Sequence, residues 1–198
     1  GREALLAESV GIAMLTVLQR LAPAERVAFV LHDVFGVSFD EIAGIVDRSP
    51  VAARQLASRA RRRVQGATDE DQALDTARHR DIVEPFFKAS RAGDFNALLS
   101  VLDPDVALRC DEAALRMGAR SGWLTAELRG ADAVARQFAG QAQAAQLALI
   151  DGVPGGVWAT GGTPRVVFGF TIENGRVVEI ELAADPARLS RHEVEILA

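Results

Sequence analysis

The sequence predicts two domains: an all-α helix-turn-helix domain, and after it an α+β domain with a curved antiparallel sheet and helices. Apolar residues recur at helical spacing through residues 1–66, whereas strand-like runs rich in Val, Ile, Leu and Phe fill residues 145–183. The charge also divides at Gly66. Nine arginines against seven acids give +2 before it, and thirteen basic against twenty acidic residues give -7 after it. Such a difference favours two domains with different partners, 1–66 and 77–198, joined by a linker over 67–76.

The composition is that of a soluble globular protein. About half of the 198 residues are hydrophobic and a quarter are charged. No apolar run reaches the roughly 18–20 residues of a membrane span, and Gly1 is not followed by a signal peptide. The missing initiator Met suggests a tag remnant or a fragment of a longer protein. The single cysteine, Cys110, fits the reducing cytoplasm and is expected to be a small buried apolar residue. With three scattered histidines it cannot complete a metal site, so we expect no metal and no cofactor.

Two helices are predicted at the start of the chain. Residues 5–21 carry apolar side chains every three or four positions, which indicates one amphipathic helix. Pro23 stands where the next helix begins, a position that costs proline no backbone hydrogen bond. The apolar residues of 25–35 then predict a buried helix that Gly36 ends.

Two shorter helices follow, and each has a clear start signal. Ser38 and Glu41 form a capping box, in which each side chain satisfies a free backbone N–H of the other residue. This helix should end near residues 47–48. Ser49 then caps a new helix with Pro50 at its first position. That helix, over 51–65, contains five arginines and no acid.

Two short helices joined by a tight turn, the second of them basic, are typical of a helix-turn-helix motif, whose second helix enters the DNA major groove. We expect its packing face to comprise Leu56, Ala60 and Val64. Arginine and glutamine suit contacts to guanine and adenine, and further arginines suit phosphates. The expected DNA-binding residues are Ser49 at the cap, Val51, Arg54, Gln55 and Ser58 at base edges, and Arg59, Arg62 and Arg63 at phosphates. The alternative is that this helix is only a solvated basic face.

These residues resemble region 4 of the extracytoplasmic-function sigma factors. The similar segments are Leu21-Ala-Pro-Ala-Glu-Arg-Val-Ala-Phe-Val-Leu-His-Asp-Val-Phe-Gly, Ser38-Phe-Asp-Glu-Ile-Ala, and Ser49-Pro-Val-Ala-Ala-Arg-Gln-Leu-Ala-Ser-Arg-Ala-Arg-Arg-Arg. The resemblance implies that the helix after Ser49 binds the -35 promoter element on behalf of RNA polymerase core. It also implies a region 2, which is expected to precede residue 1.

The second half of the chain reads as helices followed by strands, an α+β order. Helices are expected over 77–92, from Asp94 to about 102, and over 130–140. A strand is expected over 106–110, and 111–128 is interpreted as a mobile loop or an irregular strand pair. Further strands are predicted over 145–151, 157–160, 165–173 and 176–183. Asn174-Gly175 between the last two is a strong signal for a two-residue hairpin turn.

This order resembles the SnoaL-like branch of the nuclear-transport-factor-2 (NTF2) fold, a sheet wrapped around helices as a cone. The similar pieces are Arg91-Ala-Gly-Asp-Phe-Asn-Ala-Leu-Leu, Leu102-Asp-Pro-Asp-Val and Phe168-Gly-Phe-Thr-Ile-Glu-Asn-Gly-Arg-Val. One group of these sigma factors carries such an extension, with the signature Asn-Pro-Asp-Lys-Leu. Here it is altered, and its residues are expected to be regulatory: Asp185, Pro186, Arg188 and Leu189. The group's Asp-Gly-Gly-Gly-Lys signature is replaced by Asp111-Glu-Ala-Ala-Leu.

Two functions of different class are consistent with the sequence. The first is a transcription factor whose C-terminal domain modulates activity through contact with the sigma domains or with RNA polymerase. The second is a SnoaL-like isomerase or cyclase, or a small-ligand-binding protein, with a helical appendage. Arg109, Asp111 and Glu181 are the polar residues that could lie in the cone. Relatives of this fold use a buried carboxylate with a tyrosine or a protonated acid, and the chain has no tyrosine. We therefore expect no catalysis.

Overall fold

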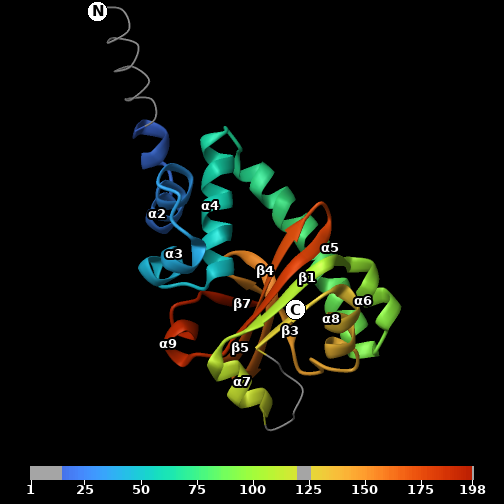
Figure 1. Cartoon of the computed structure of the whole chain (residues 1–198). Coiled ribbons are helices and arrows are strands. Elements are labelled where there is room, and N and C mark those ends of the chain that lie inside the picture. Colours follow the sequence, from blue (N-terminus) through green and yellow to red (C-terminus); the bar gives the residue numbers. More distant parts are fainter. Residues whose placement is uncertain (1–14, 120–125, 198) are drawn as a thin grey trace, which may run out of the picture. The chain divides into compact units, whose positions relative to one another are not determined.

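The computed structural model describes residues 15–119 and 126–197, and these divide into two compact units, 1–73 and 74–198. The first unit is helical (Figure 1), and its residues 15–19 are the described part of the predicted first helix. Its other elements are α2 (Pro23–Phe29), the π-helical turn η1 (Val30–Val34), α3 (Phe39–Val46) and α4 (Pro50–Val64).

The second helix differs from the prediction at its end. It begins at Pro23, as expected, but changes at Val30 from α-helical to π-helical turns. A π turn adds a residue to the helical turn and so rotates the following side chains away from the buried face. Val34 and Phe35 are therefore 64% and 70% exposed, and the expectation that this segment is buried to its end is wrong.

The second unit holds a mixed sheet with helices. The Thr68 hydroxyl accepts a hydrogen bond from the Asp71 N–H, and the Asp71 carboxylate accepts one from the Thr68 N–H. Helix α5 therefore starts directly after Thr68. Most of the segment 67–76, which was expected to be a linker, is therefore helical. The helices are α5 (Asp69–Ala92), α6 (Phe95–Val101), α7 (Glu112–Ala119), α8 (Ala131–Phe138) and α9 (Pro186–Leu189).

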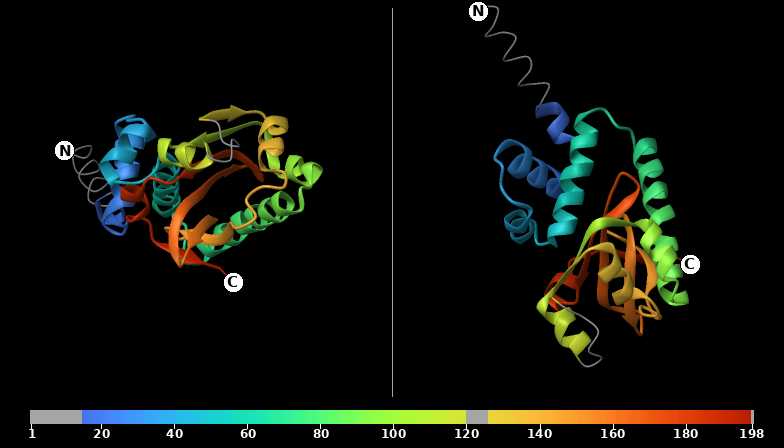
Figure 2. Two further views of the ribbon diagram at one scale, coloured as in Figure 1. Left: turned by 90° about the horizontal axis from the view of Figure 1, so that it is seen from below. Right: turned by 45° about the vertical axis from the view of Figure 1, so that its right-hand side comes forward.

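The sheet has the strand order β2-β1-β6-β5-β4-β3-β7. Its neighbours are antiparallel except β1 and β6, which run parallel. The sheet is curved in the left view of Figure 2. The strands are β1 (Leu102–Cys110), β2 (Glu127–Arg129), β3 (Gln146–Ile150), β4 (Val153–Thr160), β5 (Thr163–Glu173), β6 (Arg176–Ala183) and β7 (Val194–Ile196).

The core of this unit lies between α5 and the sheet. Phe86 and Phe87 of α5 are buried and make edge-on contacts with Phe168 and Phe170 of β5, at centroid distances of 5.2–5.6 Å. Gly156 of β4 faces the Phe87 ring, and a Cβ there would lie 2.2 Å from the ring carbon Cζ. The close packing of α5 on β4 therefore requires glycine at this position.

The segment after Asp111 is the largest correction to the prediction. Residues 112–119 form the helix α7 instead of a loop or a strand. The Asp111 carboxylate accepts the Ala114 N–H at 2.7 Å, and Arg116 pairs with Glu112 one turn earlier at 2.9 Å. An N-terminal cap and an i,i+4 ion pair stabilise the short helix, although Gly118 interrupts its apolar spacing.

Candidate DNA-binding surface and C-terminal pocket

The two helices of the predicted helix-turn-helix motif begin where the sequence indicates. Ser38 Oγ accepts the Glu41 N–H at 3.4 Å, and the Glu41 carboxylate accepts the Ser38 N–H at 3.2 Å. The Ser38 hydroxyl also donates to this carboxylate at 2.6 Å, and this bond, together with the one from the Ser38 N–H, lowers the pKa of the Glu41 carboxyl. Asp47 ends α3 in the left-handed conformation, with φ +58°, and Ser49 Oγ accepts the Ala52 N–H at 3.1 Å. A three-residue connection thus fixes the direction in which α4 leaves α3.

The packing face of α4 is close to the one expected, but is shifted along the helix. Ala53, Leu56 and Ala57 are buried and form a cluster with Ala28 of α2 and with α3. Ala60 is fully buried as predicted, whereas Val64 is only half-buried. Four small or apolar positions at helical spacing therefore hold α4 against its own unit.

Two arginines of α4 engage one buried acid. Glu25 of α2 is 5% exposed, and its carboxylate lies 3.6 Å from Arg59 Nε and 3.4 Å from Arg63 Nη1. Both arginines were expected at phosphates. Pairing with Glu25 fixes their stems and orients α4 on α2, and it reduces the net positive charge that they offer to an anion.

A third arginine is held by the π-helical turn. Arg61 donates from Nε to Asp33 Oδ2 at 2.6 Å and from Nη2 to Oδ1 at 2.7 Å. The hydrogen bonds from Arg61 lower the pKa of the Asp33 carboxyl, and the same bonds raise the pKa of Arg61. This two-point pair joins η1 to α4 and gives Arg61 a structural role.

The remaining predicted contact residues differ in exposure. Ser49 and Val51 are buried, so Ser49 acts in the structure as the helix cap. Arg54 is half-buried, and its guanidinium carbon lies 5.4 Å from the centroid of the Phe39 ring of α3, a cation–π arrangement. Gln55, Ser58 and Arg62 are also half-buried.

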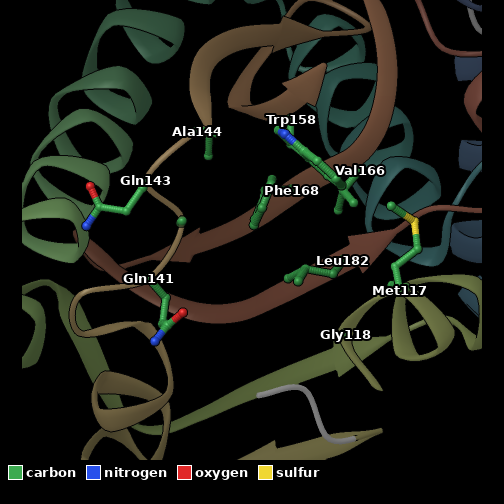
Figure 3. Close-up of a pocket in the computed structure, with 12 residues that line it drawn as sticks. Met117, Gly118, Gln141, Gln143, Ala144, Trp158, Val166, Phe168 and Leu182 are labelled. Atoms are coloured by element: carbon green, nitrogen blue, oxygen red, sulfur yellow. The ribbon is translucent and has the colours of Figure 1, made fainter. Parts of the chain in front are cut away.

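The second unit contains a pocket of about 360 Å³ (Figure 3). Its walls come from α7, from strands β4 to β6 and from the segment 141–145. The twelve lining residues are Ala114, Met117, Gly118, Gln141, Ala142, Gln143, Ala144, Ala145, Trp158, Val166, Phe168 and Leu182. None of them carries a charge or a group that titrates near neutral pH.

The polar residues that were candidates for the cone do not line this pocket. Leu182 faces it, and because alternate residues of a strand point to opposite faces, Glu181 points to the other face of the sheet. Arg109 pairs with Glu179 at 3.5 Å. Asp111 accepts backbone N–H bonds from Ala114, Ala184 and Asp185 at 2.7–3.0 Å.

Neither the cysteine nor any metal-binding group adds chemistry to the described residues. Burial, with the nearby Asp111 and Glu181 charges, raises the pKa of the Cys110 thiol to about 12, so the thiol stays protonated and a poor nucleophile. Residues 15–119 and 126–197 contain no group of three or more side chains arranged to bind a metal ion. Within these ranges, no helix combines the length and the apolar character of a membrane span.

The predicted regulatory segment forms α9, directly after β6. Asp185 caps it by accepting the Ala187 N–H at 2.8 Å, and Leu189 is buried in a small cluster with residues of β3, β4 and β5. Val194 of β7 packs against the same cluster. Part of the C-terminal segment therefore covers its own domain, while Pro186 is exposed and Arg188 is half-buried.

Comparison with known proteins relates both units to one group. Residues 12–64 match the model of the family "Sigma-70, region 4". The chain is 34% identical over 201 residues to the ECF RNA polymerase sigma factor SigJ of Mycobacterium tuberculosis, covering 93% of this chain and 62% of SigJ. It is 32% identical to the probable ECF RNA polymerase sigma factor SigI of the same species, covering 96% of this chain and 63% of SigI. The chain thus spans less than two thirds of these relatives.

Solved structures include a relative that matches most of the chain and a structure that matches about half of it. The crystal structure of the extracytoplasmic function sigma factor SigJ from Mycobacterium tuberculosis is 34% identical, with a TM-score of 0.46, and covers 88% of this chain and 63% of SigJ. An NTF2-like protein of unknown function from Burkholderia xenovorans is 19% identical, with a TM-score of 0.37, and the match covers 54% of this chain and 81% of the Burkholderia chain. Residues 12–64 of the chain thus match sigma-70 region 4, and more than nine tenths of the chain is similar to ECF sigma factors of the SigJ and SigI kind.

Proposed function

We propose that this protein reads the -35 element of a promoter for RNA polymerase, and that its C-terminal domain modulates this activity in the cytoplasm. The observation that carries the first part is α4. It is a capped helix with five arginines and no acid, placed after a tight turn within a sigma-70 region 4 domain. Helices of this kind bind in the major groove.

The arginines of α4 divide into groups with different roles. Arg54 and Gln55 lie in the first half of the helix and are proposed to contact base edges, together with Ser58, whereas the buried Val51 is left out of this set. Arg62 is proposed to contact phosphate, and Arg59 and Arg63 to do so from their positions beside Glu25. Arg61 is excluded from this set because Asp33 binds it at two points.

A titration of point variants tests these roles. Arg54→Ala should cost about 1–3 kcal/mol on the cognate -35 duplex and relax the preference for one base. Arg62→Ala should weaken binding to cognate and scrambled duplexes alike and give a shallower salt dependence. Arg61→Ala is the matched control on the same helix, and should leave both the base preference and the salt slope unchanged. Equal, sequence-independent losses for Arg54→Ala and Arg62→Ala would contradict base reading by Arg54.

RNA polymerase core is the proposed protein partner. Val34, Phe35 and Ile45 are each more than 60% exposed in the region 4 unit. Val34 and Phe35 are consecutive, and adjacent exposed apolar side chains are typical of protein-binding surfaces. Phe35→Ser should therefore reduce association with core polymerase and leave binding to a naked -35 duplex unchanged, which a pull-down beside a duplex titration would measure.

Modulation is proposed to act through Asp185, Pro186, Arg188 and Leu189, by contact with the sigma domains or with polymerase. The supporting observation is that α9, the capped helix between β6 and β7, has an exposed Pro186 and a half-buried Arg188. In a sigma factor carrying region 2, Arg188→Ala should change transcription in vitro without changing affinity for the -35 duplex. Arg165→Ala, an exposed arginine of β5, is the control. Unchanged transcription by Arg188→Ala would oppose this role.

A further inference from the structure

The pocket of the C-terminal unit is maintained by its small side chains. Ala114 and Gly118 come from α7, and Ala142, Ala144 and Ala145 from the segment before β3. These residues leave a space of about 360 Å³ against Trp158, Phe168 and Leu182. That volume lies within the roughly 300–1,000 Å³ of small-molecule sites in proteins.

The pocket offers few hydrogen-bonding groups. Gln143 lies at its rim, but its Nε2 donates to the Arg91 carbonyl at 2.9 Å and to the Gly140 carbonyl at 3.2 Å. Figure 3 shows the Gln143 amide turned away from Phe168 and Leu182. Gln141 and the Trp158 indole are the other side chains of the lining that can form a hydrogen bond.

Water is a poor occupant of such a space. At about 30 Å³ per molecule, the pocket would hold about a dozen waters. The waters that touch its described walls would lose hydrogen bonds that they make in bulk solvent, because these walls offer few donors or acceptors. An apolar molecule that displaces them removes its own apolar surface from water, which favours binding.

We infer that this pocket binds a small, neutral, apolar molecule that contains one or more rings. Trp158 and Phe168 offer aromatic surfaces to a ring, and Met117 offers a polarisable sulfur. A charged ligand is disfavoured because none of the twelve described lining side chains can neutralise it, and an anion is further disfavoured by the net charge of -7 over residues 67–198. This inference concerns the C-terminal unit alone and does not rest on the reading of the -35 element.

The exposure of the lining indicates where the ligand enters. Phe168, Val166 and Leu182 are at most 8% exposed and form the floor. Met117 is 36% exposed, and Gln141 and Ala144 are exposed as well, so they form the rim. A ligand that enters at the rim reaches the aromatic floor without displacing a core side chain.

Two fluorescent probes that differ in one group test the chemistry. N-phenyl-1-naphthylamine is neutral, and 1-anilinonaphthalene-8-sulfonate adds a sulfonate to the same ring system. Titrated into the intact chain, the neutral probe should show saturable binding to one site, at least tenfold tighter than the sulfonate. Equal affinities, or no saturable binding of the neutral probe, would overturn the inference.

A substitution at the rim tests the location. Ala144→Trp should fill the mouth and weaken binding of N-phenyl-1-naphthylamine at least tenfold. Ala92→Trp, an exposed alanine of α5 outside the lining, should leave the affinity unchanged. Trp158→Leu, which removes an aromatic wall, should weaken binding severalfold and provides a second variant if Ala144→Trp does not fold. Probe binding that none of the pocket variants changes would place the probe elsewhere and defeat the assignment.

Discussion

The arginines of α4 carry the same charge but have different structural partners. Arg61 binds Asp33 at two points, Arg59 and Arg63 lie beside the buried Glu25, and Arg54 lies over Phe39. From sequence, Arg59 and Arg63 were grouped with Arg62 because all three recur on the second half of one helix. Their partners come from α2, which is distant in sequence, so no local spacing could reveal them.

The Asp33–Arg61 pair should stabilise the region 4 unit in a pH-dependent way. The pair is partly solvent-exposed, so Asp33→Ala should lower the free energy of unfolding by at most about 1 kcal/mol at neutral pH. Because Arg61 holds the folded-state pKa of Asp33 below its ordinary value, the stabilisation is present above the unfolded pKa of about 3.9. It is lost as the pH falls through the lower, folded-state pKa.

Thermal unfolding of wild type and Asp33→Ala, followed by circular dichroism between pH 3 and 7, would measure this difference. Asp40→Ala is a control that removes one acid from α3 of the same unit. The prediction fails if the Asp33→Ala difference is as large at the lowest pH as at neutral pH.

Among the elements, the β5–β6 hairpin shows how a glycine can be required by conformation alone. Glu173 pairs with Arg176, and the two residues between them, Asn174 and Gly175, have φ values of +50° and +76°. These values confirm the two-residue turn that the sequence predicts. A Cβ at Gly175 would have no atom within 4 Å, so any cost of substitution is conformational.

Gly175→Ala should therefore destabilise the C-terminal unit by about 1–2 kcal/mol, and Gly175→Val by more, since a β-branched residue resists positive φ. The same glycine-to-alanine change at Gly44, inside α3 and equally uncrowded, should stabilise the first unit by about 1 kcal/mol. Calorimetric melting of each variant would measure both effects. Effects of the same sign at the two positions would contradict the conformational explanation.

Asp111 connects two elements that lie far apart in sequence. Its Oδ1 caps α7, which carries one wall of the pocket, and its Oδ2 accepts the N–H groups of Ala184 and Asp185 at the start of α9. Asp111→Ala removes all three bonds. It should cost about 1–3 kcal/mol of stability and weaken N-phenyl-1-naphthylamine binding, because α7 loses its cap.

Asp111→Asn keeps one carbonyl acceptor and should show smaller losses in both measurements. Asp105→Ala, which removes an exposed acid of β1, serves as the control. Wild-type melting and wild-type probe affinity for Asp111→Ala would show that the bonds to Asp111 contribute nothing.

The sequence predicted elements where local chemistry determines them. The caps at Ser38, Ser49 and Asp94 and the hairpin at Asn174-Gly175 are all observed, because each depends on residues within a few positions. α7 was missed because its cap is shared with residues 184–185 and its glycine interrupts the pattern. β4 begins four residues earlier than predicted, at Val153, since Pro154 and two glycines normally end strands. Here Gly156 is required by the packed Phe87 ring.

For the whole molecule, the sequence property that most clearly indicates function is the unequal distribution of net charge between the two parts of the chain. The part with a net charge of +2 contains the residues that match sigma-70 region 4, and the part with -7 contains the sheet. Composition could not predict the pocket, because its lining combines residues from three strands with alanines of a separate segment. Only the fold brings these together.

The last strand of the chain, β7, pairs antiparallel with β3 through Ala148 with Ile196 and Ile150 with Val194. The segment that leads into β7 is bonded to Asp151, which lies in the turn after β3. His192 Nδ1 lies 2.7 Å from Asp151 Oδ2, and Asp151 Oδ1 accepts the Glu193 N–H at 3.0 Å.

This pairing has a consequence for solution behaviour. Without β7, β3 would become an edge strand with unpaired N–H and C=O groups, a template on which a second molecule can add a strand. A chain truncated after Arg191 should therefore self-associate, and its mass in analytical sedimentation should rise with protein concentration. Ile196→Lys is the control because it keeps the backbone pairing of β7, and it should sediment as the wild type does. A truncated chain with wild-type sedimentation would show that β7 does not protect this edge. Loss of transcription after deletion of the tail can thus arise from aggregation, which makes single substitutions in α9 the cleaner probe of regulation.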